Sequence, residues 1–530
     1  MTSASKNPSA LLVVLLLAAA CGGDDDPGTQ ADAAAPVTAD AAPGAADAAA
    51  DADLASPDAQ TEPPADAEPP PNGLHAAYFK KHGALVLERD DATVDFNWAA
   101  AAPADAVGVD HFSVRWSGTL DVPAAGAYTF VTNADDGVRL RVNGATVVDD
   151  WTFHAVQRKE GTLTLPAGKT PIELEYFDKD YNAEVHLSWR STDAGISEQV
   201  IPTERLSTAG ASTATASPKP PYDNPVVPFD CPDPGILAVP AVPPAINPTY
   251  YMACTGGHFY IKRSDDLVLW EETGKAILAD GKAPWAANGG RNWAPEIHKV
   301  GNGYVAYFTS ADADNKLAIG AAYASDPTGP FTDVGAPLVQ DPLGAIDATF
   351  FHDDDGKNYL IYKIDGNSAG QPTPIFAREL SADGRAFAPG STRHQLLVNQ
   401  SSTWEGGVIE APWVVKHDGK YYIFYSGNVY DARYRTGVAR SSSILGTYEK
   451  KGDPILTNND KWVGPGHGSV VSIGNADYFL YHAWKAAAGG GQDGSAGRQG
   501  LLDRIVWENG WPRLSDGSPS KGINPWPGAQ

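Results

Sequence analysis

The chain has 530 residues, of which 42% are hydrophobic and 10% aromatic, so it has the length for two to four domains of roughly 100–200 residues and is not disordered throughout. Its formal net charge of −26 excludes a typical nucleic-acid-binding protein, because phosphate contacts require clustered Lys and Arg. Three Cys in this length exclude a small scaffold held together by disulfides.

Residues 1–21, MTSASKNPSALLVVLLLAAAC, have the layout of an export signal. One Lys precedes an apolar run that is shorter than the roughly 20 residues of a membrane-spanning helix. Small residues before Cys21 resemble a bacterial lipoprotein signal, although Ala18 stands where Leu is usual and Leu17 lies one position off. The resemblance implies that Cys21 is lipidated. We therefore expect an exported protein, lipid-anchored to the bacterial membrane or cell surface, or otherwise secreted.

Residues 22–72 are rich in Ala, Asp and Pro and contain no aromatic residue, which predicts a disordered linker. Twelve acidic residues and no basic residue fall in this stretch, so the rest of the chain carries a net charge of only −14 and suits a neutral substrate. A second linker spans 208–221. These two linkers leave folded blocks at 73–207 and 222–520, followed by a tail at 521–530.

The block 73–207 contains short alternating strand patterns separated by turn signals. HFSVRWSGTLDV places Phe112, Val114 and Trp116 on one face, and Asp-Gly and Asn-Gly in the next stretch are hairpin signals. No helix-length pattern interrupts these strands. The pattern predicts an antiparallel β-sandwich.

Five motifs of this block, GLHAAYF, VDFNW, FSVRWSGTL, ADDGVRLRVNG and VHLSW, resemble the domain first seen in anthrax protective antigen. The resemblance implies a carbohydrate-binding module. In the fungal adhesin branch of that family, a paired Asp coordinates calcium, which implies a calcium site at Asp135 and Asp136. The alternative is that the pair only forms the turn before Gly137.

The block 222–520 repeats one unit five times. Each copy begins with a polar residue and a short apolar strand, and four of the five continue through a turn into an aromatic strand, as in EAPWVVKHDGKYYIFYSG. The polar residues stand 63, 51, 63 and 57 positions apart and are Asp233, Glu296, Asp347, Glu410 and His467. Four strands in roughly 50 residues are typical of a propeller blade. We therefore predict an all-β chain with a β-sandwich module joined to a five-bladed β-propeller.

The innermost strand of each propeller blade lines the central channel, so equivalent residues of successive blades point at one pocket. This brings together Asp233, Asp347, Glu410 and His467. Three carboxyl groups around a pocket suit cleavage of a glycosidic bond, which needs one protonated and one ionised carboxyl. The alternative is that each acid only caps its strand.

The motifs PDPG, AIDATFF and WEGGVIEAPW resemble those of glycoside hydrolase family 43, whose members are five-bladed propellers. The resemblance implies that Asp233 is the general base, Glu410 the general acid, and Asp347 the residue that raises the pKa of the donor and orients it. It also implies an inverting mechanism, in which the two reacting carboxyls stand about 6.5–9.5 Å apart.

The same resemblance implies several substrate contacts. WAPEI and GRQG match motifs that place Trp293 and Arg498 beside the sugar, and Trp404 is a further stacking candidate because it precedes the acid motif. GPGHGSVV places His467 at the channel centre, where several members of the family have calcium or ordered water. No cofactor is needed for the chemistry itself. For Trp404, the alternative is packing between blades.

The resemblance implies an enzyme that acts on plant cell-wall polysaccharides or oligosaccharides containing arabinose or xylose. We expect α-L-arabinofuranosyl linkages to be cleaved, with β-xylosidase activity as the second choice. A non-catalytic surface lectin or adhesin is the competing class. Nucleic acid is not expected as a partner, and a membrane is contacted only through the lipid anchor.

Cys231 and Cys254 lie on what should be neighbouring strands of the first blade. In an exported protein these two residues could form a disulfide that closes a loop of about 23 residues. The alternative is a pair of buried free thiols.

Overall fold

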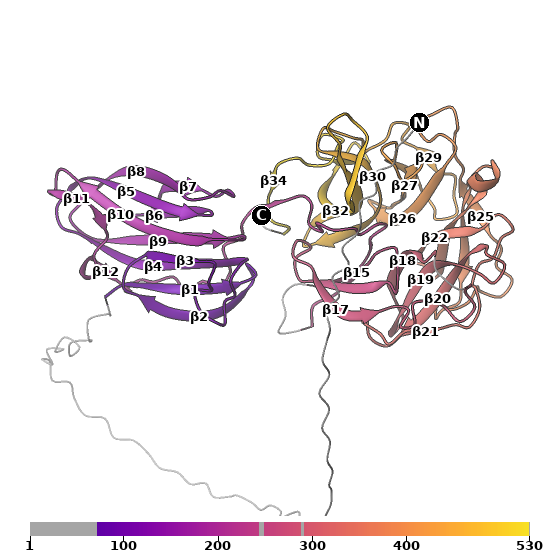
Figure 1. Ribbon diagram of the computed structural model, residues 1–530, viewed down its shortest axis with the longest axis horizontal. Helices are drawn as coiled ribbons and strands as arrows, with labels where there is room; N and C mark the ends of the chain where they lie inside the picture. Colours follow the sequence, from indigo (N-terminus) through magenta and orange to yellow (C-terminus); the bar gives the residue numbers. More distant parts are fainter. Residues whose placement is uncertain (1–71, 243–247, 288–290, 529–530) are drawn as a thin grey trace, which may run out of the picture. The chain divides into compact units, whose positions relative to one another are not determined.

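The computed structural model describes residues 72–242, 248–287 and 291–528. Almost all regular structure in these ranges is strand, and it forms a β-sandwich followed by a five-bladed propeller, which confirms the predicted all-β architecture (Figure 1). The signal segment with Cys21 lies outside the described residues. In these ranges, no helix is long and apolar enough to cross a membrane.

The sandwich consists of two antiparallel sheets. The first has the order β2-β1-β4-β9-β6-β7 with β12 beside β4, and its strands are β1 (Leu74–Lys80), β2 (Ala84–Asp91), β4 (Phe112–Val122), β6 (Val138–Val142), β7 (Ala145–Asp150), β9 (Gly168–Asp178) and β12 (Leu206–Ser207). The second has the order β11-β10-β5-β8 with β3 beside β10, and its strands are β3 (Asp95–Ala99), β5 (Gly126–Asp135), β8 (Gln157–Leu165), β10 (Ala183–Ser191) and β11 (Ile196–Val200). A short 3₁₀ turn, η1 (Thr203–Arg205), precedes β12.

Alternation along the strands fills the sandwich core, as expected for sheets with one buried face. In β10, for example, every second residue is buried, and Trp116 and Trp189 are fully buried. Asn143-Gly144 forms the expected hairpin turn between β6 and β7. The hairpin expected at Asp136-Gly137 is wrong, because β5 and β6 belong to different sheets. Glycine is needed where the chain passes from β5 in one sheet to β6 in the other, because a Cβ atom on Gly137 would lie 2.2 Å from the Phe177 ring.

The propeller contains five four-stranded antiparallel meanders. The first blade consists of β14 (Gly235–Val239), β15 (Thr249–Ala253), β16 (Tyr260–Ser264) and β17 (Glu271–Ala276). The second consists of β18 (Trp293–Val300), β19 (Gly303–Ala311), β20 (Leu317–Ala324) and β21 (Thr332–Asp333). The third consists of β22 (Ala345–His352), β23 (Asn358–Ile364), β24 (Ile375–Leu380) and β25 (His394–Leu397), with η2 (Gly366–Ala369) after β23. The last two are β26 (Ile409–His417), β27 (Lys420–Gly427), β28 (Arg435–Ser441) and β29 (Glu449–Lys450); and β30 (Trp462–Ile473), β31 (Ala476–Ala486), β32 (Gln492–Glu508) and β33 (Trp511–Leu514).

The ring closes where the fifth blade meets the first. The innermost strands β14, β18, β22, β26 and β30 each contact the next, and β30 returns to β14. The chain entering the propeller also joins the last blade, since Val227 and Gly500 exchange backbone hydrogen bonds of 3.1 and 3.0 Å. The segment 521–530, expected to be a tail, contains β34 (Ile523–Asn524), which pairs with β13 (Tyr222–Asp223). Trp526 beyond it is buried in a cluster with Val227 and Leu502, so residues 521–528 pack with the propeller.

A bulge with one left-handed residue recurs in the innermost strands. The pairing register shifts once in β18, β22 and β26 and twice in β30. The residues with positive φ at these places, or just before β14 in the first blade, are Asp233, Ala294, Asp347, Ala411 and His467. A bulge bends a strand and redirects its side chains, so each blade turns one stretch of backbone toward the channel in the same way.

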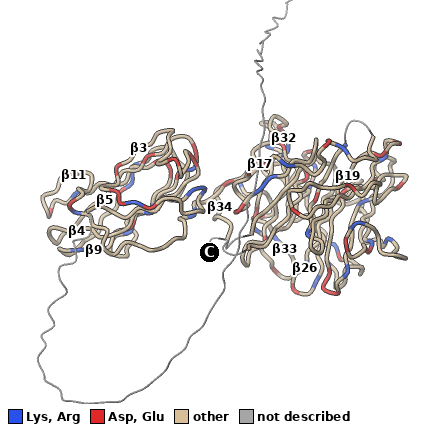
Figure 2. The backbone as a smooth tube through the Cα atoms, turned by 90° about the horizontal axis from the view of Figure 1, so that it is seen from below, with Lys and Arg blue, Asp and Glu red and all other residues tan. Residues whose placement is uncertain are grey.

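Charged residues of both signs are interspersed along the backbone of each body (Figure 2).

The structure joins Cys231 and Cys254 in a disulfide between the segment before β14 and the end of β15. Both residues are buried in the cluster that also contains Ile236 and Met252. The bridge spans 23 positions of sequence.

We expect the Cys254→Ser substitution to lower the free energy of unfolding of the propeller by about 2–4 kcal/mol, because it removes the constraint on the unfolded chain. Guanidinium unfolding with and without reductant measures this loss, and reductant should have no further effect on the variant. Thiol labelling of the unfolded wild type without reductant should modify neither Cys231 nor Cys254. Labelling of both residues would contradict the bridge.

Candidate active site

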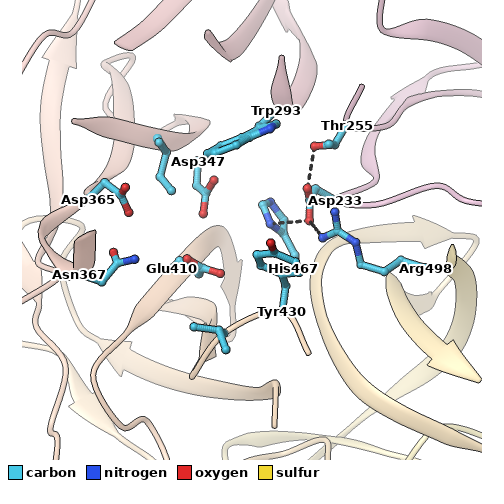
Figure 3. A pocket seen from close by; sticks show the side chains of 12 residues that line it. Asp233, Thr255, Trp293, Asp347, Asp365, Asn367, Glu410, Tyr430, His467 and Arg498 are labelled. Carbon is cyan, nitrogen blue, oxygen red and sulfur yellow. Dashed lines mark hydrogen bonds and ion pairs between the residues drawn. The ribbon is translucent and has the colours of Figure 1, made fainter. Parts of the chain in front are cut away.

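A cavity of about 260 Å³ lies at the propeller axis. All five blades contribute to its wall, so the residues come together only when the ring closes (Figure 3). The lining residues are Asp233, Thr255, Trp293, Ile346, Asp347, Asp365, Asn367, Glu410, Val429, Tyr430, His467 and Arg498. The cavity therefore unites Asp233, Asp347, Glu410 and His467, as the sequence predicts for one axial pocket.

The repeated bulge positions these side chains in two ways. Asp233, Asp347 and His467 are themselves the left-handed residues of their blades. Glu410 comes one position earlier, before the left-handed Ala411, and is thus the structural equivalent of Trp293. The five polar residues aligned in the sequence are therefore not all equivalent.

Glu296 shows the same difference in register. It lies two positions after the left-handed Ala294 and does not line the cavity. Its carboxylate contacts the His298 ring at 2.7 Å. Glu296 therefore makes a buried contact within the second blade and takes no part in the cavity wall.

Asp233 is 8% exposed and is surrounded by donors. Its Oδ1 lies 3.0 Å from Arg498 Nη1 and 3.1 Å from His467 Nδ1, and its Oδ2 accepts a hydrogen bond of 2.6 Å from Thr255 Oγ1. Burial alone would raise the pKa of Asp233, but the charges of Arg498 and His467 outweigh it and hold that pKa well below the usual range. This carboxyl is therefore ionised.

His467 is the cationic partner of this carboxylate. Burial would lower the pKa of His467, but Asp233 and then Asp347 raise it to about 9. A protonated His467 therefore places a positive charge near the carboxyl groups of Asp233 and Asp347.

Glu410 has two partners that the sequence analysis did not identify. Lys363 Nζ lies 2.8 Å from its Oε2, and the Tyr434 hydroxyl donates to its Oε1 at 2.7 Å. Burial would raise the pKa of Glu410, but the ammonium group of Lys363 and then the Tyr434 hydrogen bond lower it. In the substrate-free site, Glu410 is thus favoured in its ionised form.

Asp347 has the opposite shift. Burial raises its pKa to about 7, with His467 opposing and the negative charge of Glu410 reinforcing the shift. Its Oδ2 accepts a hydrogen bond of 3.0 Å from the Ala411 backbone, one residue from Glu410. The two carboxyls therefore titrate as a pair, and the proton of the free pair belongs mainly to Asp347.

The aromatic residues divide into cavity and packing positions. Trp293 lines the cavity, whereas Trp404 does not: its indole donates to the Gly452 carbonyl and stacks near Tyr425. Tyr430, which the sequence analysis did not identify, is 58% exposed at the cavity wall, and the Arg498 guanidinium lies 5.0 Å from its ring centroid. Tyr430 is therefore a second aromatic surface that a sugar ring could contact.

The calcium expected in the channel at His467 and in the sandwich at Asp135 and Asp136 stays a prediction. Among the described residues, no three His, Cys, Asp or Glu side chains form a group that could hold a metal ion. In the channel, His467 pairs with Asp233, which also pairs with the cationic Arg498.

In the sandwich, both carboxylate oxygens of Asp136 accept backbone hydrogen bonds of 2.9 Å, from His154 and Lys179. Burial and then the charge of Asp136 raise the pKa of Asp135 to about 6. These hydrogen bonds tie Asp136 to two other segments of the sandwich.

Two family models match the chain. The model described as glycosyl hydrolases family 43 matches residues 222–512, and the model described as the PA14 domain matches residues 71–201. Among solved structures, the chain is similar to that of a thermostable family-43 glycoside hydrolase, at 30% identity and a TM-score of 0.50, over 57% of this chain and 99% of the other.

Curated relatives match different shares of the chain. The probable arabinan endo-1,5-alpha-L-arabinosidase C of Aspergillus clavatus is 28% identical over 50% of this chain and 87% of its own length. The extracellular exo-alpha-(1->5)-L-arabinofuranosidase ArbA of Cellvibrio japonicus is 27% identical over 51% and 83%. The anti-sigma-I factor RsgI3 of Acetivibrio thermocellus is 32% identical over 26% of this chain, which spans only 21% of that protein.

Proposed function

The chain belongs to glycosyl hydrolases family 43, whose model covers more than half of its length, and on this premise we propose that it is an exported hydrolase of arabinose- or xylose-containing plant polysaccharides. The observation that carries the proposal is the unequal environment of the carboxyls in one cavity. Cations hold Asp233 ionised, while the pair of Asp347 and Glu410 retains a proton near neutral pH. Glycosidic cleavage requires such a division between base and acid.

In the proposed mechanism, Asp233 removes a proton from a water molecule while the oxygen of that water attacks the anomeric carbon. Glu410 donates a proton to the glycosidic oxygen, the bond between that oxygen and the anomeric carbon breaks, and the leaving sugar departs as an alcohol. Arg498, His467 and Thr255 keep the base oriented through the contacts that they make to Asp233. Asp347 holds the proton of the carboxyl pair beside the donor.

For the substrate, we propose α-L-arabinofuranosyl linkages, with β-xylosyl linkages as the second candidate. The arabinan-directed names of the two relatives from Aspergillus clavatus and Cellvibrio japonicus support the first choice, since the chain covers most of both proteins. One relative is named as endo-acting and the other as exo-acting, so they support no choice between these two modes.

The proposal extends to the rest of the chain. The PA14 match at 71–201 supports a module that holds the enzyme near carbohydrate. The relative from Cellvibrio japonicus is named as an extracellular enzyme, which supports export. Lipid attachment at Cys21 is part of the proposal, and labelling of growing cells with a fatty-acid analogue, with Cys21→Ala as the control, tests it.

We expect Glu410→Ala to reduce kcat on linear arabino-oligosaccharides by about 100- to 10,000-fold, because the leaving sugar then lacks a proton donor. The loss should be much smaller on 4-nitrophenyl α-L-arabinofuranoside, whose leaving group needs little protonation. Asp233→Ala should abolish turnover of both substrates, because the attacking water lacks its base. Steady-state rates on the two substrates measure these effects.

Glu379→Gln is the matched control, since Glu379 forms only a partly exposed pair with Lys357. It should keep the wild-type rates. Wild-type rates no higher than those of Glu410→Ala on arabinosides and xylosides alike would contradict the proposal and favour the carbohydrate-binding alternative.

The single displacement predicts a product of inverted anomeric configuration. Proton NMR of the first turnovers, recorded before mutarotation, should show the β-anomer of L-arabinofuranose released from an α-linked substrate. The α-anomer as first product would exclude the direct attack of water that is assigned to Asp233.

Asp347→Asn should move the alkaline limb of kcat/KM to lower pH. The substitution removes the carboxyl group whose negative charge disfavours ionisation of Glu410, while the ammonium group of Lys363 remains. The pKa of Glu410 therefore falls, and the donor loses its proton at a lower pH. The pH profile on an arabino-oligosaccharide measures the shift. A profile with lower rates but the same alkaline limb would remove this role from Asp347.

A further inference from the structure

Lys363 is a buried cation in the third blade. It lies near the end of β23, in the sequence NYLIYKI, and every residue of this strand is buried. The side chain of Lys363 has no exposed surface. A lysine is almost never fully buried unless its charge is paired, so the partners of this ammonium define its role.

The ammonium group bridges two carboxylates. Its Nζ lies 2.8 Å from Glu410 Oε2 and 2.9 Å from Asp365 Oδ1. Because Tyr434 donates to the other oxygen of Glu410, both oxygens of that carboxyl are fixed, one from the third blade and one from the fourth. Asp365 lines the cavity as Glu410 does, so both partners of Lys363 face the space where substrate would lie (Figure 3).

We propose that Lys363 is a positioning residue that fixes the carboxyl of Glu410 and favours its ionised form in the free enzyme, and that Asp365 limits this effect by sharing the ammonium charge. The inference rests on the proposed function, in which Glu410 is the proton donor. It assigns Lys363 a role opposite in sign to that of Asp347: the cation makes the donor easier to ionise, and the neighbouring carboxylate makes it harder.

The other groups that face Glu410 come from four elements. Asp347 on β22 adds negative charge, whereas Tyr434 before β28 and His467 on β30 favour the ionised carboxyl through a hydrogen bond and a positive charge. Asp233, before β14, adds negative charge that raises the pKa of Asp347 and so affects the pair formed by Asp347 and Glu410. Lys363 contributes the largest of the charges that stabilise the ionised form, and it is the only one of these cations in contact with Glu410 in the described part of the chain.

The test compares pH profiles of kcat/KM on an arabino-oligosaccharide, because a sugar leaving group requires the donor. Lys363→Met keeps a side chain of similar length without the charge. We expect its alkaline limb to move to higher pH by about one unit or more, as for loss of an adjacent opposite charge. A purely structural role would lower the rate at every pH and leave the limb in place, and that outcome would overturn the inference.

Asp365→Asn provides a second, oppositely signed measurement. It removes the competing carboxylate, so the full ammonium charge acts on Glu410 and the alkaline limb should move to lower pH. Circular dichroism melting establishes that each variant is folded. If Lys363→Met does not fold, the profile of Asp365→Asn decides alone, and an unchanged or raised limb in that variant overturns the inference.

Activity of the wild-type enzyme distinguishes failure of the proposed function from failure of the role assigned to Lys363. No turnover of any arabinoside or xyloside by the wild type would overturn the proposed function, and this inference with it. Turnover by the wild type with unshifted limbs in the folded variants would overturn the role of Lys363 alone and leave the hydrolase proposal standing.

Discussion

The axial site depends on a backbone constraint that every blade repeats. A left-handed conformation costs a non-glycine residue roughly 1–2 kcal/mol, yet Asp233, Ala294, Asp347, Ala411 and His467 all adopt it at the channel. Such a conformation persists only when the surrounding structure enforces it. Here the enforcement comes from the strand pairing on both sides of each bulge and from the neighbouring blades in the closed ring. Strand backbone therefore presents Asp347 and His467, and the segment just before β14 presents Asp233.

The second organising feature is charge balance in a buried space. Four carboxyl groups, those of Asp233, Asp347, Asp365 and Glu410, share the cavity wall, and ionisation of all four in isolation would be very unfavourable. Arg498 and His467 stand on the side of Asp233, whereas Lys363 stands between Glu410 and Asp365. The cations are thus distributed unequally, and this asymmetry gives chemically similar groups different protonation states.

The sequence predicted the ring and most of the site, because the repeat period and the short motifs are local properties of the chain. It did not predict the register within the blades: Glu296 and Glu410 look equivalent to Asp347 as polar residues that begin an apolar strand, and only the bulge shows that they are offset. The Asp-Gly turn was wrong for a similar reason, since a turn signal does not tell whether the next strand stays in the same sheet. Lys363 had one visible signal, a charge inside an otherwise apolar strand, but its partners come from residues that only folding brings near.

The ring has one junction at which the two ends of the propeller chain pair with each other. There β13 pairs with β34, and Val227 exchanges backbone hydrogen bonds with Gly500. The same stretch holds Asp233 against its cation: the Cys231 amide donates to the Arg498 carbonyl at 2.7 Å, and the Arg498 amide donates to Asp230 at 2.7 Å. Opening this junction would therefore separate Asp233 from Arg498. A change in β34 would then disturb the surroundings of Asp233, although the two lie almost 300 residues apart along the chain.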